Sequence, residues 1–174
     1  MEINFLAPGI GVIDDIYIQN EELIEHAEAG QWRDGTAGNG VNPDIRITDV
    51  HDLDQNNEIH QELLQTVIDG INLYGERFPQ LRVTSGEHLR VMRYTKGGFY
   101  ALHADGGANN PRNLSIVLFL NDDFEGGELE FPEFDLKLKP KAGQLVLFPS
   151  SFVYTHKSNE IIDGTKYAMV SWFR

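Results

Sequence analysis

The chain has 174 residues, of which 41% are hydrophobic, and its 27 acidic and 14 basic side chains give a formal net charge of −13. This length is sufficient for one domain with a sizeable core, and the composition is typical of a folded globular protein rather than a disordered one. The acidic balance, without a basic stripe, argues against nucleic acid and anionic membranes as partners, although it can equally serve solubility alone.

The first residues and the cysteine content bear on the cellular compartment. No cysteine is present, which excludes disulfides, zinc–thiolate sites and a thiol nucleophile. The apolar residues 1–10 lack a basic region and are interrupted by Pro8 and Gly9, so they predict a first strand and turn and not a signal peptide. No apolar run approaches the ~20 residues of a transmembrane helix. These features predict a cytoplasmic protein that does not bind membranes.

Two helices are predicted in the N-terminal part of the chain. Asn20 can cap a helix that ends at Gly30, with acidic residues in its first turn. A second helix is predicted from Glu58 to about Gly75, because apolar residues recur every three or four positions. These apolar residues are Ile59, Leu63, Val67, Ile71 and Tyr74. The glycine- and asparagine-rich residues 32–43 between the helices predict either a surface loop or a mobile segment at the entrance of an active site.

From Leu81 onward the pattern changes to short strands separated by clusters of Gly, Pro, Asn and Asp. Eight such strands after two helices predict an α+β fold, with a double-stranded β-helix (jelly roll) core that helices brace on one face. We expect one domain over residues 1–174, with helical support at about residues 15–80 and the jelly-roll core at about residues 81–174. The predicted strands are residues 88–95, 99–103, 113–121, 127–131, 134–139, 144–148, 152–156 and 167–173.

The most informative motif is His103-Ala104-Asp105, which is followed further along the chain by His156. Residues two apart on a strand point to the same face, so His103 and Asp105 can reach one ion together, with Cα atoms roughly 6–7 Å apart at ~3.3 Å per residue. Two imidazoles and one carboxylate are the ligand set of non-haem Fe(II) oxygenases, and they leave coordination positions open. The triplet alone is a weak signal, because His and Asp are common in surface loops, so its weight depends on the neighbouring segments.

The segments around this motif occur in a particular order. Residues 94–105 are typical of a strand, a glycine turn and a second strand, and they are followed by residues 119–122, 126–131, 141–148 and 164–172. From about residue 88 to the C-terminus, this ordered set resembles the prolyl 4-hydroxylase type of 2-oxoglutarate- and Fe(II)-dependent dioxygenases. Residues 144–151 are also similar to bacterial PKHD-type hydroxylases. The resemblance implies that His103, Asp105 and His156 are the ligands of Fe(II).

The resemblance also implies roles in binding the co-substrate 2-oxoglutarate. Lys166 would pair with the distal carboxylate of 2-oxoglutarate, and Tyr94 would form a hydrogen bond with the co-substrate. A buried, isolated ammonium is costly unless a counter-charge binds it, so the alternative for Lys166 is an exposed surface lysine. Phe119 is a departure, since many relatives have a tyrosine there whose hydroxyl holds the same carboxylate. Lys166, with Ser115 or Thr155, would then have to hold that carboxylate without the tyrosine.

Other polar residues have simpler interpretations. Arg112, in the glycine-rich loop after the motif, could contact the substrate, but a solvated arginine is the favoured interpretation. Arg90 and Arg93 predict exposed or ion-paired side chains on a strand. Surface or packing roles are predicted for the remaining histidines, His26, His51, His60 and His88.

Residues and resemblance together imply a dioxygenase that uses Fe(II), 2-oxoglutarate and O2 to hydroxylate a C–H bond, with His103, Asp105, His156 and Lys166 as catalytic residues. The expected substrate is a prolyl residue in a peptide or protein, the co-products are succinate and CO2, and ascorbate is an expected accessory cofactor. Two alternatives stay open: an oxygenase of a free amino acid or small metabolite, and a non-catalytic cupin-like module that binds a metal or small ligand. Lys166 separates the last alternative, because a pure metal-binding module needs no cation beside open coordination positions.

Overall fold

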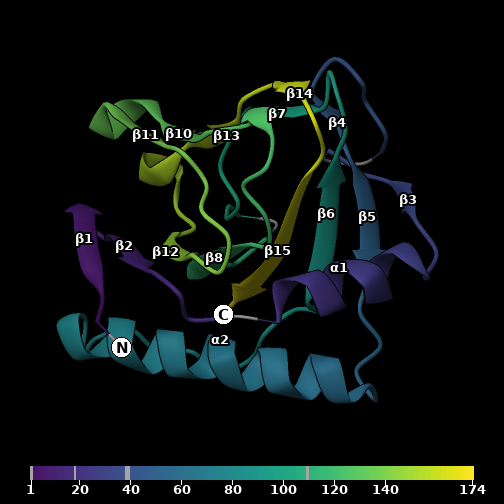
Figure 1. Ribbon diagram of the computed structural model, residues 1–174. Coiled ribbons are helices and arrows are strands. Elements are labelled where there is room, and N and C mark those ends of the chain that lie inside the picture. The colour runs from purple at the N-terminus through teal and green to yellow at the C-terminus, as the bar shows by residue number, and fades with distance from the viewer. Residues whose placement is uncertain (1, 18, 38–39, 109) are drawn as a thin grey trace.

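The computed structural model describes residues 2–17, 19–37, 40–108 and 110–174, and it consists of two main antiparallel sheets with two helices along one side (Figure 1). The larger sheet has eight strands, in the order β1 (Asn4–Ala7), β2 (Ile10–Ile13), β12 (Leu145–Pro149), β8 (Leu114–Phe119), β15 (Lys166–Phe173), β6 (Arg90–Tyr94), β5 (Asp49–Asp52) and β3 (Arg33–Asp34). The smaller sheet has five, in the order β11 (Leu136–Leu138), β10 (Leu129–Phe131), β13 (His156–Ser158), β7 (Phe99–His103) and β4 (Arg46–Ile47). A separate pair joins β14 (Ile161–Asp163) to β9 (Glu125–Gly126).

Alternation along the strands of the larger sheet divides its apolar side chains between two cores. On β8, Ile116 and Leu118 belong to the core shared with the helices, whereas Val117 and Phe119 belong to the core between the two sheets. This is the period of two expected for a strand that is covered on both faces. The strand thus presents Phe119 to the interior that holds the candidate site.

The helix α2 (Glu58–Arg77) packs on the outer face of the larger sheet. The side chain of Asn57 caps it by accepting a hydrogen bond from the backbone N–H of Ile59 at 2.9 Å. Gly70 lies where the helix meets the sheet, and a Cβ atom there would be 2.6 Å from Cδ2 of Leu145. Glycine weakens a helix by ~1 kcal/mol relative to alanine, but at this position it permits the close approach of helix and sheet.

Helices occupy both predicted places, with small differences at their ends. The helix α1 (Asn20–Glu28) begins at Asn20, so Gln19 and not Asn20 is the N-cap, and the Asn20 amide donates to the carbonyl of Tyr17 at 3.2 Å. The second helix ends at Arg77, two residues beyond the predicted end. Neither helix in the described ranges combines the length and the apolar character needed to cross a membrane.

Between the helices the chain adds β3, β4 and β5, where only helical support and a loop were predicted. These strands are two to four residues long. They form by pairing with distant strands at the edges of both sheets, and a local sequence pattern does not reveal such pairing. Residues 38 and 39 of the predicted loop lie outside the described residues.

The predicted strand at residues 152–156 is wrong in its first half. Phe152–Tyr154 form a turn of 3-10 helix, and β13 begins only at His156. The preceding strand β12 belongs to the larger sheet and β13 to the smaller one, so the chain crosses between sheets here and cannot continue as one strand. Phe152 is accordingly 79% exposed. A second 3-10 turn, Pro132–Phe134, likewise shortens the strand predicted at residues 134–139.

Candidate metal and co-substrate site

The structure brings together His103, Asp105 and His156, the three predicted metal ligands. His103 ends β7, Asp105 follows two residues later, and His156 begins the neighbouring strand β13. One ligand atom from each residue lies within 4.8 Å of the others. The Nε2 atoms of His103 and His156 are 3.5 and 3.6 Å from the two carboxylate oxygens of Asp105. Within the described ranges, no second cluster of His, Cys, Asp and Glu has such geometry.

Backbone carbonyl groups fix the orientation of both imidazoles. Nδ1 of His103 lies 2.8 Å from the carbonyl oxygen of Ala101, and Nδ1 of His156 lies 3.1 Å from that of Tyr154. A proton on Nδ1 satisfies each contact and leaves Nε2 as the lone-pair donor. Both Nε2 atoms are therefore available to a metal on the side of Asp105.

An irregularity in the pairing of β7 with β13 shapes the wall beside His103. His156 pairs with His103, but Ser158 pairs with Tyr100, so β7 contains one more residue than β13 over this stretch. Such a bulge turns a side chain to the other face of the strand. As a result the Tyr100 ring stacks on His103 with 3.6 Å between ring centres, while Leu102 points outward and is 54% exposed.

The ionisation of the cluster suits a divalent cation. Burial alone would raise the pKa of Asp105, but His156, His103 and a 2.7 Å hydrogen bond from the Ser115 hydroxyl together hold it below its usual value. Burial lowers the pKa of His156 to about 4, although the carboxylate of Asp105 acts in the opposite direction. At neutral pH the cluster therefore offers a carboxylate and a neutral His156 imidazole, which fit the donor set that Fe(II) takes in oxygenases.

Lys166 is buried, at 2% exposure, and is not an exposed surface lysine. Its ammonium donates to the carbonyl of Gly127 at 2.6 Å and to the hydroxyl of Ser158 at 3.0 Å. Both acceptors are neutral, and burial lowers the pKa of Lys166 to about 7 although Glu128 acts in the opposite direction. Burying an ammonium among neutral acceptors costs desolvation energy, and the charge of an anionic ligand would offset that cost.

One narrow cavity between the two sheets is lined both by the metal-ligand candidates and by Lys166. Phe119 and Tyr94 flank the lysine, whose Nζ lies 5.3 Å from the centre of each ring. Tyr94 is the cross-strand partner of Lys166. Burial raises the pKa of Tyr94, so its hydroxyl stays protonated and can donate a hydrogen bond. The side chain of Phe119, which has no hydroxyl, is fully buried.

The position of Ser115 differs from the role expected for it. Its hydroxyl donates to Asp105 and lies 2.7 Å from the hydroxyl of Ser150. It stands four residues before Phe119 on β8, at the metal end of the cavity. Ser115 thus contacts a candidate metal ligand, while the hydrogen bonds of Lys166 among the described residues go to Gly127 and Ser158. A role of Ser115 toward the co-substrate stays a prediction.

The hydroxyl that does contact Lys166 belongs to Ser158, which the sequence analysis missed. Thr155, the other expected helper, directly precedes His156 and is not among the residues that line the cavity of Lys166. Ser158 follows His156 by two residues on β13. The period of two along a strand was the signal that could have found it.

Arg46 is a second residue that the sequence analysis missed. It is buried on β4, and it lines both the narrow cavity and a wider recess of about 480 Å³ that opens beside the metal cluster. Its guanidinium lies 4.5 Å from the centre of the Tyr100 ring and donates to the carbonyl of Thr36 at 3.0 Å. Its Nε atom makes no hydrogen bond to any described residue. Because β4 was not predicted, no sequence signal placed Arg46 at the site.

Arg112 is not the solvated arginine that was favoured. Its guanidinium makes two hydrogen bonds to Glu87, at 2.6 and 2.7 Å, and lies 3.8 Å from the centre of the Trp172 ring. It also donates to the backbone carbonyl of Asp105 at 3.3 Å. Arg112 thus holds the loop after the metal cluster against Trp172, which lines the recess.

Of the two arginines predicted on a strand, Arg90 also lines the recess beside the metal cluster. Arg90 and Arg93 are ion-paired with Asp52 and Asp49, at 3.0 and 2.9 Å. None of the other histidines belongs to the metal-ligand cluster found among the described residues; they are His26, His51, His60 and His88.

Known proteins decide the family. Residues 89–174 match the model of the 2OG-Fe(II) oxygenase superfamily. A PKHD-type hydroxylase of Prochlorococcus marinus (strain NATL1A) is 30% identical over 162 residues, which cover 85% of this chain and 68% of that protein. The chain belongs to the 2OG-Fe(II) oxygenase superfamily. A PKHD-type hydroxylase of Parvibaculum lavamentivorans is 40% identical over 92 residues, but the chain covers only 41% of its length.

The fold is that of solved oxygenases. A prolyl hydroxylase from Trichoplax adhaerens, solved in complex with a hypoxia inducible factor oxygen degradation domain peptide fragment, superposes with a TM-score of 0.81 at 18% identity. The match covers 95% of this chain and 83% of that one. This likeness confirms the predicted jelly-roll type of fold.

Proposed function

We propose that the protein is a 2-oxoglutarate- and Fe(II)-dependent dioxygenase that hydroxylates a C–H bond of a prolyl residue in a peptide or protein, with formation of succinate and CO2. The observation that carries the proposal is one cavity lined both by a two-histidine, one-carboxylate cluster and by a buried lysine. A non-catalytic cupin-like module would gain nothing from the buried ammonium, whose desolvation is costly. An anionic co-substrate explains it.

His103, Asp105 and His156 would hold the iron. Bound Fe(II) would supply the activation of O2 that side chains cannot provide. The protein's part is to keep one anionic and two imidazole donors aimed at a single point and to limit water. The rings of Phe131 and Phe148, 5.5 and 4.7 Å from the centre of the His156 ring, form an apolar wall behind that ligand.

Lys166 would bind the distal carboxylate of 2-oxoglutarate. The carbonyl of Gly127 and the hydroxyl of Ser158 hold its ammonium in place, and lysine suits this task because it acts as a compact point charge. Phe119 would contribute an apolar wall in place of a second donor. The protonated hydroxyl of Tyr94 would donate to the co-substrate.

Support for a prolyl substrate comes from the recess beside the metal cluster and from the relatives. The rings of Tyr100 and Trp172 line this recess, and Arg46 adds a buried donor. Aromatic edges suit contact with a pyrrolidine ring, and the polar remainder of the lining, with its guanidinium, suits a peptide backbone. The solved Trichoplax relative is a prolyl hydroxylase with a bound peptide. Free amino acids and small metabolites are the alternative substrates.

The test combines co-substrate turnover with a peptide screen. The purified chain with Fe(II), 2-oxoglutarate and O2 should form succinate, and a library of proline-containing peptides should yield a product heavier by one oxygen atom, detected by mass spectrometry. Fragmentation would place the oxygen on proline. Succinate formation that only free amino acids or metabolites stimulate would replace the prolyl assignment, and no succinate under any condition would refute the proposal.

Three further expectations belong to this proposal. Ascorbate should sustain turnover over repeated cycles, which a time course with and without it would show. A cytoplasmic location can be checked by cell fractionation. Nucleic acid should not bind at physiological salt, and salt-sensitive binding of an oligonucleotide in a fluorescence titration would contradict this.

A further inference from the structure

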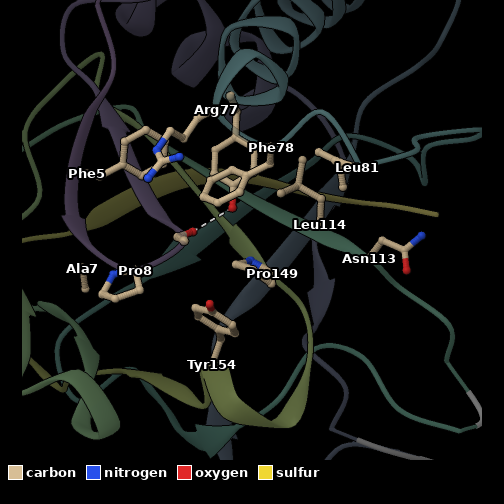
Figure 2. A pocket seen from close by; sticks show the side chains of 12 residues that line it. Phe5, Ala7, Pro8, Arg77, Phe78, Leu81, Asn113, Leu114, Pro149 and Tyr154 are labelled. Atoms are coloured by element: carbon tan, nitrogen blue, oxygen red, sulfur yellow. Dashed lines mark hydrogen bonds between the residues drawn. The ribbon is translucent and has the colours of Figure 1, made fainter.

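A second cavity lies outside the two-sheet interior, where β1, the end of α2 and one end of the larger sheet meet (Figure 2). Its volume is about 670 Å³, which is within the ~300–1,000 Å³ of ordinary ligand sites. We call it the outer groove. Figure 2 shows Phe5 and Phe78 on one side of it and Tyr154 on the other. None of the predicted site residues lines it.

The walls of the outer groove are aromatic and packed in fixed positions. The Phe78 ring contacts the rings of Phe5 and Tyr74, with centres 5.5 and 4.8 Å apart. The hydroxyl of Tyr74 donates to the carbonyl of Gly9 at 2.8 Å, the dashed line in Figure 2. Gly9 has a φ of +74°, and a Cβ atom there would lie 2.6 Å from the Tyr154 hydroxyl. Glycine at this turn is therefore required for the shape of the groove.

Charge distinguishes the outer groove from the rest of the surface. The chain has a net charge of −13, yet among the described residues no acidic side chain lines this groove, and the exposed Arg77 is the one charged residue of its lining. By contrast, a cavity beside α1 is lined by four acidic residues, Glu21, Glu22, Asp122 and Asp123. The outer groove is thus matched to an apolar segment of neutral or acidic character.

The outer groove shares a wall with the recess of the candidate site. Arg112 lines the recess, and the next residue, Asn113, lines the groove. Ser150 joins the two sides of this wall, because its N–H donates to the carbonyl of Asn113 and its carbonyl accepts from the N–H of Gly106, at 3.1 and 2.7 Å. A peptide that leaves the recess over this wall would meet the groove on the other side of it.

We propose that the outer groove docks a proline-rich segment of the peptide substrate that flanks the hydroxylated residue, an inference that rests on the proposed function. Proline-rich segments in the polyproline II conformation bind open, aromatic-lined grooves, because they are already extended and present apolar rings to flat walls. The aromatic lining, the absence of acidic side chains and the shared wall all match this occupant. An apolar carboxylate such as a fatty acid is the competing occupant.

Calorimetric titration with decaproline tests the groove without iron or 2-oxoglutarate. Wild-type protein should bind it, and Phe5→Ala should weaken binding about tenfold, the scale of one aromatic contact residue. The matched control is Leu6→Ala, which truncates the neighbouring exposed residue of β1 outside the groove. Both variants should be shown by circular dichroism to be folded at the temperature used. No binding, equal binding by folded Phe5→Ala, or binding of decanoate but not decaproline would overturn the proposal.

A charge reversal provides a second test that does not touch the core. With decaproline that carries two glutamates at one end, Arg77→Glu should weaken binding severalfold, since it replaces an attraction by a repulsion. The control Arg82→Glu reverses an exposed arginine that does not line the groove. Equal losses in the two variants would mean that net charge alone matters and would overturn the role of Arg77 in the groove.

Turnover separates this inference from the proposed function. For two peptides with the same reactive core, one with a proline-rich flank, the flank should lower KM about tenfold in wild type and in Leu6→Ala but not in Phe5→Ala. Hydroxylation of both peptides with the same KM would overturn the docking role of the groove and leave the proposed reaction intact. Decaproline binding that Phe5→Ala weakens about tenfold, without hydroxylation of any peptide, would support the groove and refute the reaction.

Discussion

The two ends of the narrow cavity between the sheets differ in how well their charged groups are compensated. At the metal end, the carboxylate of Asp105 faces two imidazoles and accepts a hydrogen bond from Ser115, and backbone carbonyls hold both rings in position. At the other end, the ammonium of Lys166 faces only a carbonyl and a hydroxyl, and burial lowers its pKa to about 7. The metal end is thus organised before any ligand arrives, whereas the lysine end is electrostatically complete only with an anion bound.

The largest effect is expected from breaking the metal end. His156→Ala should reduce succinate formation below detection and weaken Fe(II) binding, because it removes one of three ligands, while circular dichroism should show an intact fold. His88→Ala is the matched control, since His88 is exposed and outside the cluster. Full turnover by a folded His156→Ala variant would refute the ligand assignment.

Breaking the lysine end should affect the co-substrate and spare the metal. Lys166→Ala should raise the apparent dissociation constant of 2-oxoglutarate by roughly 30- to several-thousand-fold, because truncating one partner of a buried pair costs ~2–5 kcal/mol. Lys166→Arg should restore binding only in part, since the planar guanidinium needs a different approach. Lys96→Ala, at a side chain that is 76% exposed, is the control. An unchanged dissociation constant of 2-oxoglutarate in Lys166→Ala would refute the proposed role of Lys166 in binding the co-substrate.

Ser115 decides where the boundary between the two ends lies. Since its hydroxyl donates to Asp105, Ser115→Ala should weaken Fe(II) binding ~10- to 100-fold, the usual effect of losing a partner of a metal ligand. With saturating iron, the apparent dissociation constant of 2-oxoglutarate should be the same in Ser115→Ala as in wild type. Ser151→Ala, an exposed neighbour, is the control. The opposite result, with normal iron affinity and weak co-substrate binding, would restore the role first expected from the sequence.

The smallest effect is a pH dependence of stability without ligands. The pKa of Lys166 falls from 10.5 to about 7 on folding, so between these values the unfolded chain binds the extra proton and the contribution to stability rises with pH. Wild-type Tm should therefore gain a few degrees relative to Lys166→Met between pH 7 and 9, measured by scanning calorimetry. In contrast, 2-oxoglutarate should bind more weakly over that range. A difference in Tm between wild type and Lys166→Met that does not change with pH would contradict the lowered pKa of Lys166.

Features formed by residues close together in the sequence could be predicted, whereas features formed by the pairing of distant segments could not. His103 and Asp105 are two residues apart on one strand, and the phenylalanine at position 119 is read directly from the chain. Arg46 and the outer groove could not be predicted, because β4 exists only through pairing with β7 and the groove combines residues from four distant segments. Ser115 was expected beside the co-substrate, whereas its hydroxyl contacts Asp105, since a face of a strand is readable while the depth along it depends on the neighbouring strands.

The bulge in β7 has a consequence for how this active site could change over generations. Tyr100 and His103 are three residues apart, so they share a face only through the extra residue, and a regular strand of the same length would turn the Tyr100 ring out of the cavity with all three ligands still in the chain. Loss of one residue between them would instead remove the bulge and leave both side chains on the cavity face. The path of the backbone at the bulge is therefore a way to reshape the substrate's surroundings without altering a single ligand.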